Sequence, residues 1–287
     1  MKKFAKIVTC AALALSCMAS VACAEFKADK SIDVISREEG SGTRGAFVEL
    51  TGVEQKIDGK KVDMTTEDAE ITNNTSAMLI TVEGDEQAIG YVSLGSLNEK
   101  VKAVKVEDVE ATAENVSNGT YKIARPFNIA FKADGQSGLS KDFIAYIMSA
   151  EGQTIINEHG YVGSNDAAAY EGNGAEGKLV VGGSSSVSPI MEKLIEAYKA
   201  VNPKADIELQ TTDSTTGMTA AIDGTYDIGM ASRELKDDEA AALSHQAIAM
   251  DGIAVIVNQT NPTDELSVEQ IGSIFTGELT KWNEIVK

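Results

Sequence analysis

The chain has 287 residues, a formal net charge of −19 at neutral pH and an aromatic content of only 5%. So strong a negative charge argues against nucleic acid and anionic membrane surfaces as partners. A chain of this length can bury a sizeable core, in one large domain or in two lobes.

The first 24 residues have the features of an export signal. Lys2, Lys3 and Lys6 precede the apolar run Ile7 to Ala22, which is too short to span a bilayer comfortably. We therefore expect residues 1–24 to be a signal peptide and the remainder to be a soluble, extracytoplasmic protein.

All three cysteines lie within this segment, so the chain that follows it has no possible internal disulfide. Ser20 to Cys23 resembles a lipobox, whose cysteine becomes the lipidated first residue, although leucine is usual at the position of Ser20. Ala22 to Ala24 also fits the small-x-small rule for cleavage before Glu25. We expect a lipid anchor at Cys23, with free secretion after cleavage before Glu25 as the alternative.

Beyond the signal, short β-rich runs alternate with helical periodicities, which predicts an α/β fold with largely parallel sheets. The predicted strands are residues 32–36, 179–181, 207–210 and 226–231. The predicted helices are residues 44–50, 140–148, 153–159, 188–201, a short helix ending at 223–224, one beginning near 235, and 268–275. In the helix from Ser188, Pro189 suits the first turn and Asn202-Pro203 stops it.

Four of the strand-to-helix turns are rich in hydroxyls and glycine: residues 39–43, 182–186, 211–217 and the turn at Ser232. A helix N-terminus carries unpaired N–H groups and partial positive charge, and a preceding Ser/Thr/Gly loop adds hydroxyl donors. The four turns together predict a site for a small oxyanion.

The turn at residues 39–43 follows an arginine. Arg37 is a permanently charged, forked donor that can hold two oxygens at once, and we expect Glu39 to clamp its guanidinium. The alternative is that Arg37 and Arg44 form surface ion pairs with neighbouring glutamates, which would mean little. A hydroxyl before a helix is more often a cap than a ligand, and we interpret Ser140, Ser188 and Ser267 as caps, the last with Gln270 in capping-box spacing.

Catalytic and metal-binding patterns are weak. The only histidines, His159 and His245, lie beside none of the serine-rich turns, and the sequence has no Gly-x-Ser-x-Gly, Walker-type or His-Glu-x-x-His motif. The acidic runs 65–68 and 236–239 are more typical of helix starts than of calcium sites. We therefore expect no enzyme, no catalytic residue, no metal and no cofactor, and the residues alone lead to an extracytoplasmic α/β protein with an anion site.

Five segments in combination resemble the phosphate-binding (PstS-type) proteins of bacterial phosphate ABC transporters. They are "IDVISREEGSGTRGAF", "AIGYVSLGSL", "KLVVGGSSSVSPIMEKLIEAY", "YDIGMASREL" and "IGSIFTGELTKWNEI". The resemblance covers nearly all of the chain after the signal. In the usual member the GSSSVSP half comes first, whereas here the GSGTR half, from Ser31 to about Val162, precedes the half from Lys178. We therefore expect a circular permutation joined through a flexible linker at residues 160–178.

The resemblance implies a two-lobe periplasmic-binding-protein (Venus-flytrap) fold of the α/β class, circularly permuted. Lobe A would comprise residues 25–132 and 252–287, and lobe B residues 133–251, with crossing strands near 125–132 and 250–257. This split predicts that the last helix docks on the N-terminal part of the chain.

The resemblance also implies inorganic phosphate as ligand, an ABC permease as partner and a monomer. The implied phosphate-binding residues are Arg37, Ser41, Gly42, Thr43, Ser185, Ser186, Val187 through its N–H, Ser214 and Ser232, with Glu39 and Arg233 behind them. Many members have an aspartate, which accepts the phosphate proton, where this chain has Arg233. Glu234, Asp213 or Asp251 would have to replace it, or Ser232 and Arg233 add donors instead. The rival interpretations are a sulfate-binding protein, a secreted phosphoesterase that keeps the oxyanion pocket, and an adhesive scaffold.

Overall fold

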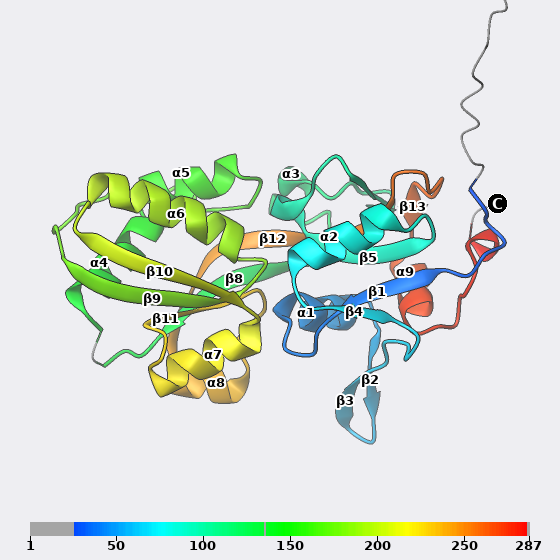
Figure 1. Cartoon of the computed structure of the whole chain (residues 1–287), viewed down its shortest axis with the longest axis horizontal. Helices are drawn as coiled ribbons and strands as arrows, with labels where there is room; N and C mark the ends of the chain where they lie inside the picture. The colour runs from blue at the N-terminus through cyan, green and yellow to red at the C-terminus, as the bar shows by residue number, and fades with distance from the viewer. Residues whose placement is uncertain (1–25, 135, 286–287) are drawn as a thin grey trace, which may run out of the picture.

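The computed structural model describes residues 26–134 and 136–285. They form an elongated α/β molecule with two halves side by side (Figure 1). Half A contains β1 (Asp33–Arg37), α1 (Gly42–Leu50), β2 (Glu54–Ile57), β3 (Lys60–Asp63), β4 (Glu70–Thr72), α2 (Thr75–Gly84), β5 (Ala88–Ser93), β6 (Val101–Ala103), β7 (Lys105–Val106), α3 (Ala113–Ser117), β13 (Glu265–Leu266) and α9 (Val268–Phe275). Half B contains α4 (Gly138–Ile147), α5 (Ala150–Glu158), β9 (Gly177–Ser184), α6 (Ser188–Val201), β10 (Ala205–Thr212), α7 (Ser214–Asp223), β11 (Ile228–Ala231) and α8 (Asp237–Ala242).

Two long strands belong to both halves. β8 (Ala124–Phe131) and β12 (Ser244–Asn258) pair antiparallel and lie in the middle of a nine-stranded sheet of order β10-β9-β11-β8-β12-β5-β1-β4, with β6 on β12. On each side of this pair the outer strands run parallel, β9 with β10 and β11, and β1 with β4 and β5. The sheet is therefore mixed rather than largely parallel as expected: every pair that includes β8 or β12 is antiparallel, and the parallel pairs lie to either side.

Each half has its own apolar core. The core of half B gathers Phe127, Leu179, Val181 and the buried face of α6. The core of half A combines side chains from both ends of the chain: Phe47 of α1 packs against Phe275 of α9, with ring centroids 4.7 Å apart. The last helix thus docks on the N-terminal part of the chain, as the split of one lobe predicts.

Helix ends follow the sequence signals in part. Ser267 and Gln270 form the predicted capping box of α9. The predicted caps Ser140 and Ser188 are wrong: Ser137 caps α4, and Ser188 lies within α6, where its hydroxyl donates to Ser184 O. The N-cap residue of α6 is Val187, whose apolar side chain cannot cap the helix.

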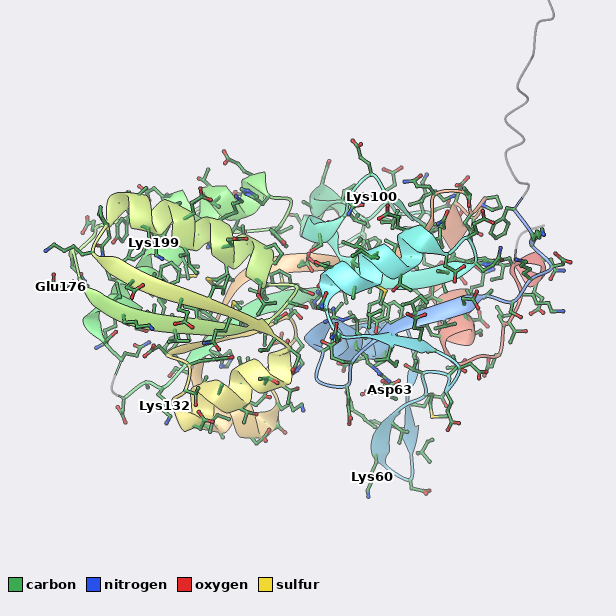
Figure 2. The ribbon with its side chains drawn as sticks, in the orientation of Figure 1. Lys60, Asp63, Lys100, Lys132, Glu176 and Lys199 are labelled. Carbon is green, nitrogen blue, oxygen red and sulfur yellow. The ribbon has the colours of Figure 1, made fainter. Side chains whose placement is uncertain are left out.

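The β2–β3 hairpin projects from half A, with Lys60 at its tip and Asp63 nearer its base (Figure 2). The linker candidate at 160–178 is irregular as far as residue 176, and its last two residues already belong to β9. The irregular part is fastened to neighbouring helices. The Tyr170 hydroxyl donates to Asp142 Oδ2 at 2.9 Å and the Tyr170 N–H to Glu151 Oε2 at 2.8 Å, so the segment is fastened to α4 and α5.

The first and last described residues lie side by side at the far end of half A (Figure 1). The Asn283 N–H donates to Ala28 O at 2.7 Å, and Ser31 pairs with Lys281 in an isolated antiparallel bridge. Among the described residues, no helix is both long and apolar enough to cross a membrane.

Candidate functional site

Four helix N-termini meet where the two halves face each other. α1 and α2 follow β1 and β4 in half A, and α6 and α7 follow β9 and β10 in half B. Ligands of open α/β sheets bind beyond the carboxyl ends of parallel strands, and helix N-termini there supply N–H donors and positive potential. The fold therefore places a donor-rich region between the halves.

Buried hydroxyls fill this region and contact one another across it. Thr43 Oγ1 lies 2.8 Å from Ser186 Oγ and 3.4 Å from Ser232 Oγ, and Thr75 Oγ1 lies 3.2 Å from Ser186 Oγ. The group, which we call the hydroxyl cluster, comprises Thr43, Thr75, Ser184, Ser185, Ser186, Ser214 and Ser232. Each hydroxyl donates one proton, so the cluster can exchange its mutual bonds for bonds to the oxygens of one anion.

Arg37 is the cation that sequence reasoning placed here, and it lies against the hydroxyl cluster. Its side chain is almost completely buried, and Nη2 donates to Ser185 Oγ at 3.1 Å. Tyr91 helps to hold it, because the Arg37 N–H donates to the Tyr91 hydroxyl at 3.2 Å, while burial raises the pKa of Tyr91 to about 12. The hydroxyl is therefore neutral and able to act as acceptor at physiological pH.

The expected clamp on Arg37 is wrong in its residue. Glu38, not Glu39, forms the two-pronged ion pair, with both N···O distances 2.7 Å. Glu38 directly continues the strand beside Arg37 and folds back along the guanidinium. Glu39 lies in the following turn and is exposed.

Two further residues of the predicted turns, Ser41 and Val187, make hydrogen bonds within their own turns. Ser41 Oγ accepts from the Arg44 N–H as the cap of α1, and it keeps its own proton to donate. The Val187 N–H, expected as a ligand donor, instead donates to Ser184 O at 3.1 Å. A β-turn between Ser184 and Val187 explains this, because such a turn uses that N–H internally.

Gly42 lies at a close contact between the two halves. A Cβ at this position would overlap Ser214 Oγ and lie 2.8 Å from Ser232 Oγ, both of half B. The Thr215 N–H of half B also donates to Gly40 O at 3.2 Å. Glycine here permits contact between the halves that any side chain would prevent.

Arg233 does not join the hydroxyl cluster. Its guanidinium forms two hydrogen bonds with Glu239, at 2.7 and 2.8 Å, and its aliphatic stem packs behind Gly42. None of the three carboxylates considered as a replacement for the usual aspartate bonds to a cluster hydroxyl: Asp213 caps α7, Asp251 accepts from Ser93, and Glu234 is exposed.

Sequence reasoning missed two residues of the site. Thr75 begins α2 after Asn74, a further hydroxyl-bearing strand-to-helix turn that the sequence displays as "NNTS". Arg125 lies on β8, and its Nη2 donates to Thr43 Oγ1 at 3.1 Å. Its signal is a single charge inside the otherwise apolar strand "ARPFNIAF".

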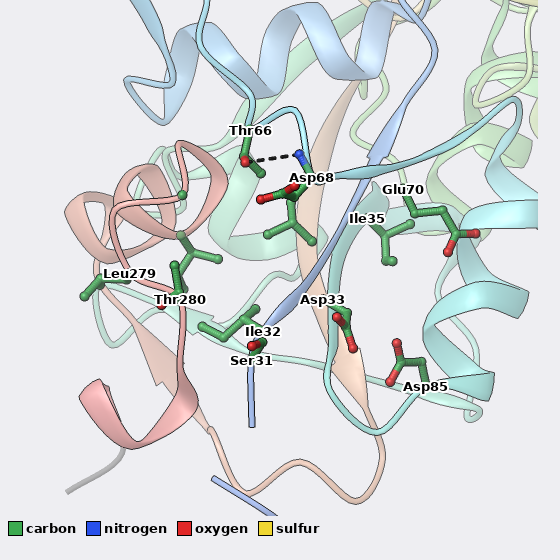
Figure 3. A pocket seen from close by; sticks show the side chains of 13 residues that line it. Ser31, Ile32, Asp33, Ile35, Thr66, Asp68, Glu70, Asp85, Leu279 and Thr280 are labelled. Carbon is green, nitrogen blue, oxygen red and sulfur yellow. Dashed lines mark hydrogen bonds between the residues drawn. The ribbon is translucent and has the colours of Figure 1, made fainter. Parts of the chain in front are cut away.

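Two pockets differ sharply in chemistry. One of about 850 Å³ borders the hydroxyl cluster at Thr75 and Ser185 and leads outward between α2 and α6. Another, of about 450 Å³, lies at the far side of half A, and in it Asp33 and Asp85 face each other (Figure 3). Asp68 and Glu70 also line this second pocket, and its carboxylates repel anions. Burial and the charge of Asp85 raise the pKa of Asp33.

Comparison with known proteins agrees with the geometry. A family model described as the PBP superfamily domain matches residues 21–151 and 168–286. Phosphate-binding protein PstS 2 of Streptococcus agalactiae serotype V is 51% identical over 259 residues, which cover 90% of this chain and 88% of that protein.

A solved structure and a more distant relative extend the comparison. The crystal structure of a phosphate-binding protein of a phosphate ABC transporter from Streptococcus pneumoniae TIGR4 is 45% identical, with a TM-score of 0.72, and the match covers 89% of this chain and all of that one. Phosphate-binding protein PstS of Bacillus subtilis, 31% identical, aligns over only 125 residues, or 42% of each chain. The chain belongs to the PstS-type phosphate-binding proteins of the PBP superfamily.

Proposed function

We propose that the protein captures inorganic phosphate outside the cytoplasm and delivers it to the permease of an ABC importer. The observation that carries this proposal is the buried hydroxyl cluster, which residues of both halves form at four helix N-termini beside Arg37. Such a site suits a tetrahedral oxyanion, and opening of the halves releases it. The protein acts by binding, as a monomer, and needs no cofactor.

The anion is held by Arg37 and by donors from both halves. Half A supplies Ser41, Gly42, Thr43 and Thr75, and half B supplies Ser185, Ser186, Ser214 and Ser232. When phosphate enters, its oxygens replace the neighbouring hydroxyl as the acceptor of each donor. Closure then depends on the ligand, because one ion connects donors of the two halves.

Calorimetric titration of phosphate into phosphate-stripped protein at neutral pH tests this function. We expect one site per chain and tight binding. Absence of heat and of any phosphate-dependent rise in the unfolding temperature would contradict the proposal, because a ligand that binds only the folded state must stabilise it.

Sulfate is the second candidate ligand, and one observation favours it. No carboxylate among the described residues bonds to the hydroxyl cluster, so nothing there demands a proton from the ligand. An acceptor in the site would reject fully deprotonated sulfate, because lone pair would face lone pair. Competition between phosphate and sulfate in the same titration distinguishes the two: displacement of phosphate by equimolar sulfate would assign the site to both ions.

We also propose that the chain order is a circular permutation, with lobe A formed by residues 25–132 and 252–287 and lobe B by residues 133–251. The adjacent chain ends in half A support it, because a direct connection there is short. The half-length alignment with the Bacillus subtilis protein also supports it, since a permuted chain aligns with an unpermuted relative one half at a time.

The anchoring of the protein is a separate proposal. Cys23 lies outside the described residues, and we propose that it carries lipid and holds the protein at the cell membrane. Mass spectrometry of the membrane fraction tests this: an acylated N-terminal Cys23 supports the anchor, and a chain that begins at Glu25 contradicts it.

A further inference from the structure

A second arginine lies beside the anion site, on a strand that joins the halves. Arg125 of β8 faces Asp251 of β12 in the cross-strand register. Both side chains are almost completely buried, 2% and 1% exposed, and Arg125 Nη2 lies 3.1 Å from Asp251 Oδ2. Asp251 is held in turn by Ser93 of β5, whose hydroxyl donates to Oδ1 at 3.0 Å.

The hydrogen-bonding capacity of Arg125 is mostly unused. A guanidinium has five N–H donors, and among the described residues Nε and Nη1 have no hydrogen-bond partner. The Phe127 ring lies under the group, 5.4 Å from its central carbon, and fixes its plane. Ion pairing with Asp251 alone does not account for a buried cation with donors to spare, because unsatisfied buried donors are costly.

Within residues 26–134 and 136–285, the one side-chain hydrogen bond that Arg125 donates goes to the anion site. Nη2 donates to Thr43 Oγ1 at 3.1 Å, and the same oxygen lies 2.8 Å from Ser186 Oγ. The Arg125 N–H donates to one lone pair of Thr43 Oγ1, and the positive charge of the guanidinium repels the Thr43 hydroxyl proton. The proton therefore points away from Arg125, toward the centre of the hydroxyl cluster.

We infer that Arg125 is a positioning residue of the anion site, which orients the Thr43 hydroxyl as a hydrogen-bond donor to the bound oxyanion. This rests on the proposed function, since it presumes that an anion binds at the hydroxyl cluster. Arg37 contacts the ligand directly, whereas Arg125 acts through Thr43. Because Arg125 lies on β8 and its counter-charge on β12, the orientation of Thr43 depends on the register of the crossing strands.

A double-mutant cycle with Arg125→Gln and Thr43→Val tests the inference, with phosphate affinity measured by calorimetry for all four proteins. We expect Arg125→Gln to weaken phosphate binding by about 10- to 100-fold, the range for one charge-assisted hydrogen bond. In the Thr43→Val background we expect the same change to have little further effect. Arg125→Lys keeps the charge and can still donate a hydrogen bond to Thr43, so it should lose less affinity than Arg125→Gln.

The outcomes separate this inference from the proposed function. Wild-type protein that binds no phosphate overturns both. Two outcomes overturn the positioning role alone, provided that the wild type binds phosphate. In the first, Arg125→Gln binds phosphate as tightly as the wild type. In the second, Arg125→Gln lowers phosphate affinity by the same factor in the wild-type and Thr43→Val backgrounds. If Arg125→Gln does not fold, the cycle is run with Arg125→Lys. A loss of phosphate affinity that vanishes in the Thr43→Val background supports the positioning role. The same loss in both backgrounds overturns it.

Discussion

Arg37 is fixed by its neighbours on three sides: Glu38 pairs with its guanidinium, Tyr91 accepts from its N–H, and Ser185 of the opposite half accepts from Nη2. Preorganised donors bind an anion without the cost of ordering a long side chain, which is about 2 kcal/mol of rotamer entropy for arginine. The residue therefore contributes more than an exposed arginine would.

Replacing Arg37 with alanine should weaken phosphate binding by about 2–4 kcal/mol, because the substitution removes a charged donor from a closed site and leaves Glu38 unpaired. Lys61→Gln is a control from the same half, since Lys61 forms surface ion pairs with Glu49 and Glu54 that each contribute at most about 1 kcal/mol. Titration of both variants checks the site. Equal affinities for Arg37→Ala and wild type would refute the placement.

Asp251 should give the protein a pH dependence of its own. Burial outweighs the attraction of Arg125 and raises the pKa of Asp251 to about 6, from an ordinary value of 3.8. Between these two pH values the unfolded chain releases this proton more readily than the folded chain does. The contribution of this group to the free energy of unfolding therefore falls as pH rises from about 4 to about 6, and is constant above that.

Carbon-detected NMR titration of the Asp251 carboxyl in ligand-free protein measures this directly. We expect a midpoint near 6, with Ser93→Ala moving it further up, because the Ser93 hydroxyl stabilises the ionised form. A midpoint below 4 would show that Arg125 and Ser93 outweigh burial.

At the scale of elements, the close approach of α1 to α7 sets how far the halves can shut. Gly42→Ala places a methyl group against Ser214 and Ser232. We expect phosphate affinity to fall at least tenfold, which is ~1.4 kcal/mol. The ligand-free protein should be as stable as wild type, since alanine suits a helix better than glycine does.

Gly45→Ala is the control for this substitution. It lies on the same helix, but the nearest side-chain atom, Arg233 Cδ, is at an ordinary contact distance of 3.8 Å. Small-angle X-ray scattering with saturating phosphate should show the Gly42 variant more extended than the Gly45 variant. Indistinguishable scattering curves would mean that Gly42 does not limit closure.

The sequence predicted the elements whose signals are local. α6 follows from its apolar face, Pro189 and the stop at Asn202, and α9 from its capping box, and both lie within a residue or two of the expected bounds. The site predictions that were wrong or missing depend on the direction of a side chain or on residues far away in the sequence. The strand-to-turn geometry after β1 decides which glutamate folds back on Arg37. Arg125 joins the site only because β8 passes beside α1.

At the scale of the whole molecule, the adjacent ends predict that the chain can be cut and rejoined. Linking Asn283 to Ala28 and opening the chain within residues 160–178 would give the order of the halves that the proposed circular permutation reverses. We expect phosphate affinity within about threefold of wild type, because no site residue moves and loop-closure entropy changes only slowly with loop length.

The cut has a defined cost in half B. It frees Tyr170 from Asp142 and Glu151, so the unfolding temperature should fall if the opening lies between residues 160 and 170, and less if it lies after Asn173. Thermal unfolding and titration of both rejoined chains check this. Loss of phosphate binding in both would argue that the order of the halves is not interchangeable.

The split core of half A also bears on the order in which the protein folds during synthesis. β12, α9 and Trp282 contribute much of that core, yet they leave the ribosome last. The segment that becomes half B is nearly continuous, needs only the two shared strands β8 and β12, and can fold as soon as β12 emerges. We therefore expect the N-terminal part of half A to lack the partners for a stable core until translation is nearly complete. If residues 1–24 are the signal peptide that the sequence predicts, this delay would keep the leading part of the chain unfolded during passage through a narrow translocation channel.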